Sequence, residues 1–414
     1  MRRSAVRDLA IVLGCSWLVR AAVIATWPRS AHSDDLDSWM QVAQQLREGA
    51  NPYVTTSIVK WPPFALVVVW TIDRAARLLD ISFFLSMRLA LIAAESAIVI
   101  VLYLMLIRFA EAPRVRWLLL AGISLNPIAI LFVCQHENID VFVGLFVVLA
   151  LWALVEYDRT GDVVPWLAGC LALGLGAFAK TVPLVLAPLL APGLRAASRL
   201  GRTLGVVLFL GPIALGLSVV FVLSPRAVFD NVVRYRSISG YFGVTGFFDA
   251  VHLHAASRVY DHLFTVVLIV VVCGLFVVAW RRGLDTSATV LLAGLMLAAI
   301  PALGPGYGPQ YAYWYVPPLL ASYLLLDDGW RRILLAFYAV AAVTYIVEYA
   351  LLIALGRFLV AFFSGSSTLE RASAWLSTPG HETLLRVPLF IAFLVLLIEG
   401  SRRLRALLVD RAVR

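Results

Sequence analysis

The chain has 414 residues, of which 62% are hydrophobic and 14% are charged, against roughly 25% charged residues in an ordinary soluble domain. This composition excludes a soluble globular protein and indicates a polytopic membrane protein. The net charge of +9 comes from arginines scattered through short loops, which favours a membrane surface over nucleic acid as the partner. The four cysteines lie singly in or at the ends of apolar runs, so neither a disulfide nor a metal site is predicted from them.

The first apolar run, residues 9–27, has about the 20 residues that cross a bilayer, and no Ala-x-Ala-like cleavage motif follows it. It is predicted to be a retained first span. By the same length criterion the sequence predicts about twelve spans in one membrane domain, residues 1–414, without internal repeats. These are residues 9–27, 83–107, 117–133, 141–155, 165–179, 182–194, 203–223, 263–280, 287–303, 313–326, 333–355 and 384–398.

One apolar run, residues 62–72, is too short for a span and is predicted to lie at the interface or to re-enter the membrane. Without it, the basic loops and both termini fall on one side, which the positive-inside rule makes cytoplasmic. These loops are residues 108–116, 158–162, 195–202, 281–282 and 327–332. Counting residues 62–72 as a span would move Arg108, Arg114 and Arg116 outside, so the charge pattern disfavours it.

Three aspartates, Asp34, Asp35 and Asp37, open the first extracytoplasmic loop. Apolar residues at helical spacing follow over residues 39–46, with glutamines opposite them, which predicts an interfacial helix. Trp61 and two prolines then place an aromatic ring at headgroup depth before the next helix. The aspartates are either the cap of this helix on a wet loop or working carboxylates.

Other polar residues gather on the same predicted face. They are Gln135, His136 and Glu137 in a luminal turn, Lys180, Arg234, Arg236, Gln310, Tyr311 and Trp314. Lys180 lies between two apolar runs, where an isolated charge costs roughly 2.5 to 3.5 kcal/mol and so is usually functional or paired. The two arginines suit phosphate binding, and the alternative is contact with lipid headgroups. The luminal turn is otherwise a solvated turn, and the aromatic residues an interfacial belt.

Four segments in order resemble the GT-C glycosyltransferases, and most closely the polyprenol-phosphate-mannose-dependent mannosyltransferases of glycosyltransferase family 87. They are DDLDSWMQVAQQLREGANPY, LNPIAILFVCQHENID, GLGAFAKTVPLVLAPLL and GPQYAYWYVPPLL. The first is also similar to the Asp-x-Asp loop of the glycosylphosphatidylinositol mannosyltransferase I family. The resemblance covers about residues 1–320, and residues 331–414 are predicted as extra C-terminal spans.

The resemblance implies an all-α GT-C fold and inverting transfer of a hexose, mannose above all, from a polyprenyl-phosphate donor. The acceptor is a lipid-linked or cell-envelope hydroxyl outside the cytoplasm. In the family register the base falls on Asp35, with Asp34 as the alternative. Arg234, Arg236, Lys180 and His136 are assigned to the donor phosphate. The sugar or acceptor is assigned to Gln135, Glu137, Gln310, Tyr311, Trp314 and Tyr53.

No cofactor is expected, because a phosphate monoester leaves well once cations neutralise its charge. Three nearby aspartates leave a divalent cation as the alternative. A second function from another class is a secondary transporter or lipid flippase, in which Asp34, Asp35 and Lys180 carry protons or substrate. The lack of an internal repeat argues against it.

Overall fold

The computed structural model describes residues 3–26, 34–56, 58–233, 243–306, 308, 311–347 and 386–413, and every regular element in these ranges is helical. Six of the helices are long and apolar enough to cross a membrane, or seven if one bent pair is counted as a single span. The prediction of an all-α, multi-pass membrane protein is therefore confirmed. The total of twelve spans stays a prediction.

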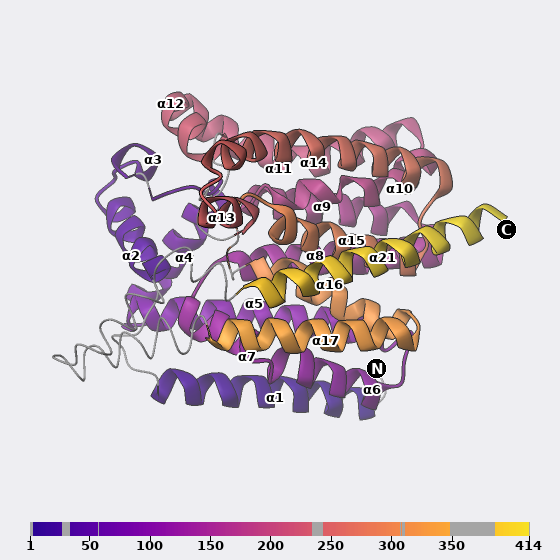
Figure 1. The fold of residues 1–414 in the computed structure, drawn as a ribbon. Helices are drawn as coiled ribbons and strands as arrows, with labels where there is room; N and C mark the ends of the chain where they lie inside the picture. The colour runs from indigo at the N-terminus through magenta and orange to yellow at the C-terminus, as the bar shows by residue number, and fades with distance from the viewer. Residues whose placement is uncertain are drawn as a thin grey trace.

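The long helices lie roughly side by side (Figure 1). The six are α1 (Arg3–Thr26), α5 (Phe83–Leu106), α8 (Asp140–Thr160), α11 (Arg199–Leu223), α14 (His254–Arg282) and α15 (Thr286–Leu303). With them run α9 (Val163–Ala179), η4 (Val182–Leu190), α10 (Ala191–Ala196), α16 (Ala312–Leu325), α17 (Asp328–Tyr345) and α21 (Val387–Val413).

The predicted span over residues 117–133 is broken into two helical segments, with a bend of 47° between them. The first segment holds α6 (Ala112–Leu119) and η2 (Leu120–Ser124), and the second holds α7 (Pro127–Leu131) and η3 (Phe132–His136). Pro127 cannot donate a backbone hydrogen bond, so the helix stops before it. The Asn126 side chain then accepts a hydrogen bond from the backbone nitrogen of Ile128 at 2.9 Å and begins the second segment.

Short helices gather at one end of the molecule, and the N-terminus and the end of α21 lie at the opposite end (Figure 1). The short helices are α2 (Asp34–Arg47), α3 (Pro52–Thr55), α4 (Phe64–Leu78), α12 (Pro225–Val228), η5 (Phe229–Val233) and α13 (Gly243–Ala250). The helix formed by the short apolar run, α4, has 15 residues and is not among those long enough to span.

Contacts between basic loops show that these loops share the end that carries the termini. Arg116 pairs with Asp8 of α1 at 2.7 Å, and Asp327 pairs with Arg403 of α21 at 3.1 Å. Arg195 donates to the backbone oxygen of Trp280 at 2.7 Å. The loops that the arginine pattern places on one side of the membrane therefore lie at the same end of the molecule. Which end faces the cytoplasm stays a prediction.

Small residues allow the helices to approach closely, as is usual inside membranes. A Cβ atom at Gly144 of α8 would lie 2.7 Å from the backbone oxygen of Tyr313 in α16. One at Gly174 of α9 would meet the backbone of Leu208 and Phe209 in α11. These contacts fix α16 against α8 and α9 against α11, and so set where the polar residues at the helix ends lie.

Candidate active site

The first polar loop is held by an aromatic contact. The apolar stripe of α2 is buried, with Leu36, Trp39 and Val42 all at 0% exposure, and Trp39 lies against Trp61 with ring centroids 4.2 Å apart. The ring of Trp39 is therefore covered by protein and does not face lipid. Packing of Trp39 on Trp61 instead fixes the helix on which Asp35 is carried.

The Asp35 carboxylate reaches the turn before α8, about a hundred residues away in sequence. Its Oδ2 atom is 2.9 Å from Nε2 of His136 and accepts a hydrogen bond from Nδ2 of Asn138 at 2.7 Å. The side chain of Asp35 is 31% exposed, whereas that of His136 is 6% exposed. The carboxylate is thus held from the protein side and open on the other.

The environment of Asp35 favours its ionised form. Burial acts to raise the pKa of Asp35. The hydrogen bond and charge of His136, followed by the hydrogen bond from Asn138, outweigh burial, so the pKa of Asp35 lies below its ordinary value. Lys180 acts in the same direction through its charge.

The turn that carries His136 and Asn138 is fixed by an ion pair. Glu137 adopts a left-handed backbone conformation with φ 58°, and its fully buried carboxylate pairs with Nε of Arg88 on α5. The structure therefore gives Glu137, a predicted sugar ligand, a charged protein partner. The left-handed residue between them turns the chain so that His136 and Asn138 both face Asp35.

Lys180 has an acidic partner that sequence reasoning did not assign. Its Nζ atom lies 2.9 Å from both carboxylate oxygens of Asp140, whose side chain is 0% exposed at the first position of α8. Nζ also lies 5.1 Å from the ring centroid of Tyr311 and 4.8 Å from that of Trp314. The expectation that this lysine is functional or paired is thus met by a buried ion pair that two aromatic rings cover.

The two rings also stack on each other, with centroids 4.1 Å apart. Tyr311 and Trp314 are 8% and 1% exposed, so both rings are buried inside the protein and do not form an interfacial belt. Beside them the Tyr313 hydroxyl donates to Glu95, which pairs with Arg20 at 2.7 Å. This buried network pairs the charged residues Arg20 and Glu95, and it ties α16 to α1 and α5.

The other predicted residues are placed less directly. Gln135 is 1% exposed in η3, and the Tyr53 hydroxyl donates to the backbone oxygen of Trp61 at 2.7 Å. The predicted residues Arg234, Arg236 and Gln310 and the side chain of Asp34 lie outside the described residues. Within the described ranges, no three His, Cys, Asp or Glu side chains are grouped to hold a metal ion.

The cluster includes two residues that sequence reasoning missed, Asn138 and Asp140. Both stood in the luminal turn that the sequence singled out. A buried lysine requires a counter-ion, and that requirement was the one signal that pointed to an acidic partner such as Asp140.

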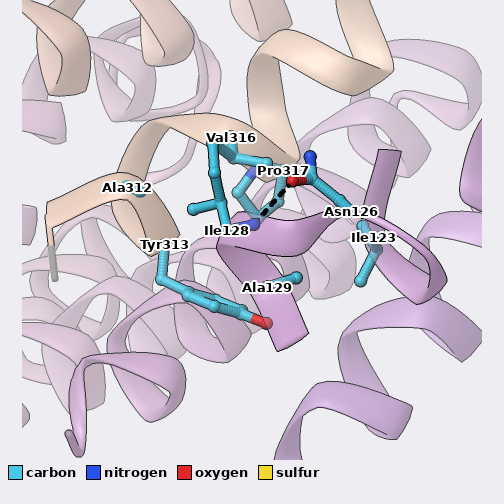
Figure 2. Close-up of a pocket in the computed structure, with 8 residues that line it drawn as sticks. All are labelled: Ile123, Asn126, Ile128, Ala129, Ala312, Tyr313, Val316 and Pro317. Carbon is cyan, nitrogen blue, oxygen red and sulfur yellow. Dashed lines mark hydrogen bonds between the residues drawn. The ribbon is translucent and has the colours of Figure 1, made fainter. Parts of the chain in front are cut away.

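A small apolar recess lies between α7 and α16 (Figure 2). Ile128, Ala129, Val316 and Pro317 line it. The side chain of Asn126 faces it, but its oxygen is used by the backbone of Ile128. The polar chemistry is therefore concentrated around Asp35 and not in this recess.

Together these features define an all-α membrane protein with a carboxylate held at one end of its helices. No known family profile matches the sequence, and no curated protein matches it. Among solved structures, the chain resembles ArnT from Cupriavidus metallidurans bound to undecaprenyl phosphate, with a TM-score of 0.54, 15% identity, and coverage of 95% of this chain and 76% of ArnT. The apo structure of the same ArnT gives a TM-score of 0.50 and 16% identity, covering 94% of this chain and 76% of ArnT. At this level of identity the likeness shows a shared fold, and the predicted GT-C fold is confirmed.

Proposed function

We propose that this protein is a membrane glycosyltransferase that moves a sugar from a polyprenyl-phosphate donor to an acceptor hydroxyl, with Asp35 as the general base. The observation that carries the proposal is the Asp35 carboxylate, which two side chains hold and which remains 31% exposed. A general base must be ionised, fixed and within reach of a hydroxyl. The Asp35 carboxylate is ionised and held by two side chains, and its exposed side is accessible to a hydroxyl.

The chemistry needs little else from the protein. The acceptor hydroxyl gives its proton to Asp35 while its oxygen bonds to the anomeric carbon, and the bond from that carbon to the phosphate oxygen breaks. A single displacement of this kind inverts the anomeric centre, so a β-linked donor yields an α-glycoside. Because the pKa of Asp35 lies below its ordinary value, base function is retained down to a lower pH than an ordinary aspartate would allow.

A polyprenyl-phosphate donor is supported by a solved structure with a similar fold and by the basic residues of this chain. The similar ArnT structure holds undecaprenyl phosphate. We assign the leaving phosphate to Arg234 and Arg236, whose guanidinium groups bind phosphate in a bidentate manner. Lys180 and His136 are the remaining cationic candidates, although both contact a carboxylate in the structure.

The finer identity of the substrates rests on the sequence resemblance. We propose mannose as the sugar, with Gln135, Gln310, Tyr311 and Trp314 around it, and a lipid-linked or cell-envelope glycan as the acceptor. The site would face the outside of the cell and both termini the cytoplasm, because positive-inside places the basic loops there. No metal is required by this scheme, since the leaving group is a monophosphate.

The test is transfer by the purified protein in nanodiscs. Polyprenyl phosphates carrying mannose, glucose or a pentose are each supplied with an extract of membrane acceptors, and release of polyprenyl phosphate and formation of glycoside are measured. We expect product with the mannosyl donor and a loss of about 10²-fold or more in kcat for Asp35→Asn, the scale of general-base removal. Donor binding should change little.

Asp37→Asn is the matched control, because Asp37 lies two positions further on the same helix and therefore points about 200° away from Asp35. It should retain turnover within a few fold. Near-normal turnover of Asp35→Asn with an inactive Asp34→Asn would make Asp34 the base. Substrate flux through proteoliposomes without any glycoside would refute the transferase and favour the transporter.

A further inference from the structure

The two hydrogen bonds to Asp35 converge on one oxygen. His136 and Asn138 both contact Oδ2, at 2.9 and 2.7 Å. In the described part of the chain, no hydrogen bond or ion pair to Oδ1 is found. The two oxygens of this carboxylate are therefore not equivalent: one is occupied by protein donors, and the other remains for substrate.

The orientation of the Asn138 amide is fixed by its second contact. Its Oδ1 accepts a hydrogen bond from the backbone nitrogen of Asp140 at 3.0 Å, at the start of α8. A flipped amide would set its NH₂ group against that N–H and its oxygen against the Asp35 carboxylate, and both contacts are repulsive. Since Asn138 is 2% exposed, water cannot readily relieve them. The amide must therefore donate to Asp35.

We infer that Asn138 is a positioning residue which, with His136, holds Oδ2 of Asp35 so that Oδ1 takes the proton of the acceptor hydroxyl. The inference rests on the proposed function and deepens it. When the acceptor O–H bond breaks, its proton moves to Oδ1. The acceptor oxygen forms the new bond to the anomeric carbon, and the electron pair of the old bond leaves with polyprenyl phosphate.

The pH profile of kcat/KM distinguishes this role from a merely structural one. Asn138→Ser keeps a hydroxyl that can accept from the backbone nitrogen of Asp140 but is too short to donate to Asp35. It should shift the acid limb of the profile upward by about one pH unit, the scale of one hydrogen bond to a charged group. Asn138→Asp should shift it further, because a second carboxylate then lies beside Asp35.

The other ionisable groups around Asp35 are the same in all variants. In the described residues they include His136 on η3, Lys180 after α9, Asp140 on α8, and Glu137, which lies between His136 and Asn138 and pairs with Arg88 on α5. A difference between profiles therefore reports the residue at position 138. Thermal melting and donor binding are measured alongside, and a second variant, Asn138→Ala, repeats the loss of the donor without the hydroxyl.

An upward shift in the order Asn, Ser, Asp at position 138, with turnover at the plateau reduced about 10-fold or more, would support the inference. An unmoved acid limb in a folded Asn138→Ser protein would overturn it, whether or not turnover falls. If the unsubstituted protein forms no glycoside with any donor, the proposed function fails first. If it transfers sugar and the acid limbs coincide, this inference fails alone.

Discussion

The ion pair between Lys180 and Asp140 should make the cost of substitution asymmetric. Asp140 is fully buried, whereas Lys180 retains 16% exposure of its side chain. Lys180→Met leaves a carboxylate in the interior without its cation. Asp140→Asn leaves an ammonium group that has a route to water. We therefore expect Lys180→Met to be the more destabilising of the two single substitutions.

The magnitude follows from the geometry. Two unit charges at 2.9 Å attract by about 6 kcal/mol at an effective dielectric constant of 20, but dehydration offsets much of this. Leaving one buried partner uncompensated costs about 3 to 5 kcal/mol. The lost contacts of the ammonium with the rings of Tyr311 and Trp314 add about 0.5 to 2 kcal/mol to Lys180→Met. Asp140→Asn should cost about 1 to 3 kcal/mol, because the amide still accepts a hydrogen bond.

The assay is equilibrium unfolding in mixed micelles with increasing SDS, followed by tryptophan fluorescence. The double variant should be more stable than Lys180→Met by about 2 kcal/mol or more, since removing both charges removes the uncompensated one. Arg226→Met is the control: the ion pair of Arg226 with Asp230 at 4.0 Å is exposed on both sides, so its loss should cost about 1 kcal/mol or less. Strict additivity of the two single variants would refute the buried pair.

Four shorter predictions follow from the same structure. In a cysteine-free protein in cells, an impermeant maleimide should label Glu48→Cys and spare Arg114→Cys, both exposed positions; the reverse pattern would overturn the orientation. Gly144→Ala should lower the unfolding midpoint and turnover together, because its Cβ meets backbone of α16; unchanged values would show that α16 can move. Glu137→Gln should cost about 3 kcal/mol of stability by leaving Arg88 uncompensated, and a change below about 0.5 kcal/mol would argue against the anchor. Turnover should survive EDTA treatment, and recovery of lost activity by a divalent cation would contradict the metal-free scheme.

Several residues of the site were predictable from the sequence, but their contacts were not. Lys180 is predicted to be functional or paired because an isolated charge between apolar runs is costly. Asp35 and His136 are assigned to the site through the resemblance of their segments to the GT-C glycosyltransferases. Their partners were not predictable. Asp35 meets Asn138 across 103 residues, and Lys180 meets Asp140 across 40. No spacing rule connects such positions, because the packing of separate helices sets the distance between them.

The sequence by itself determined the class of structure and the grouping of its ends. Long apolar runs can satisfy their backbone groups within a membrane only as helices, and the arginines mark the loops that meet beside the termini. Only the tertiary structure decided that Trp39 is buried on Trp61, that Glu137 is committed to Arg88, and which oxygen of Asp35 stays open. Those outcomes depend on how closely helices approach, and close approach depends on three-dimensional contacts such as that of Gly144 with the backbone of Tyr313, which local sequence does not encode.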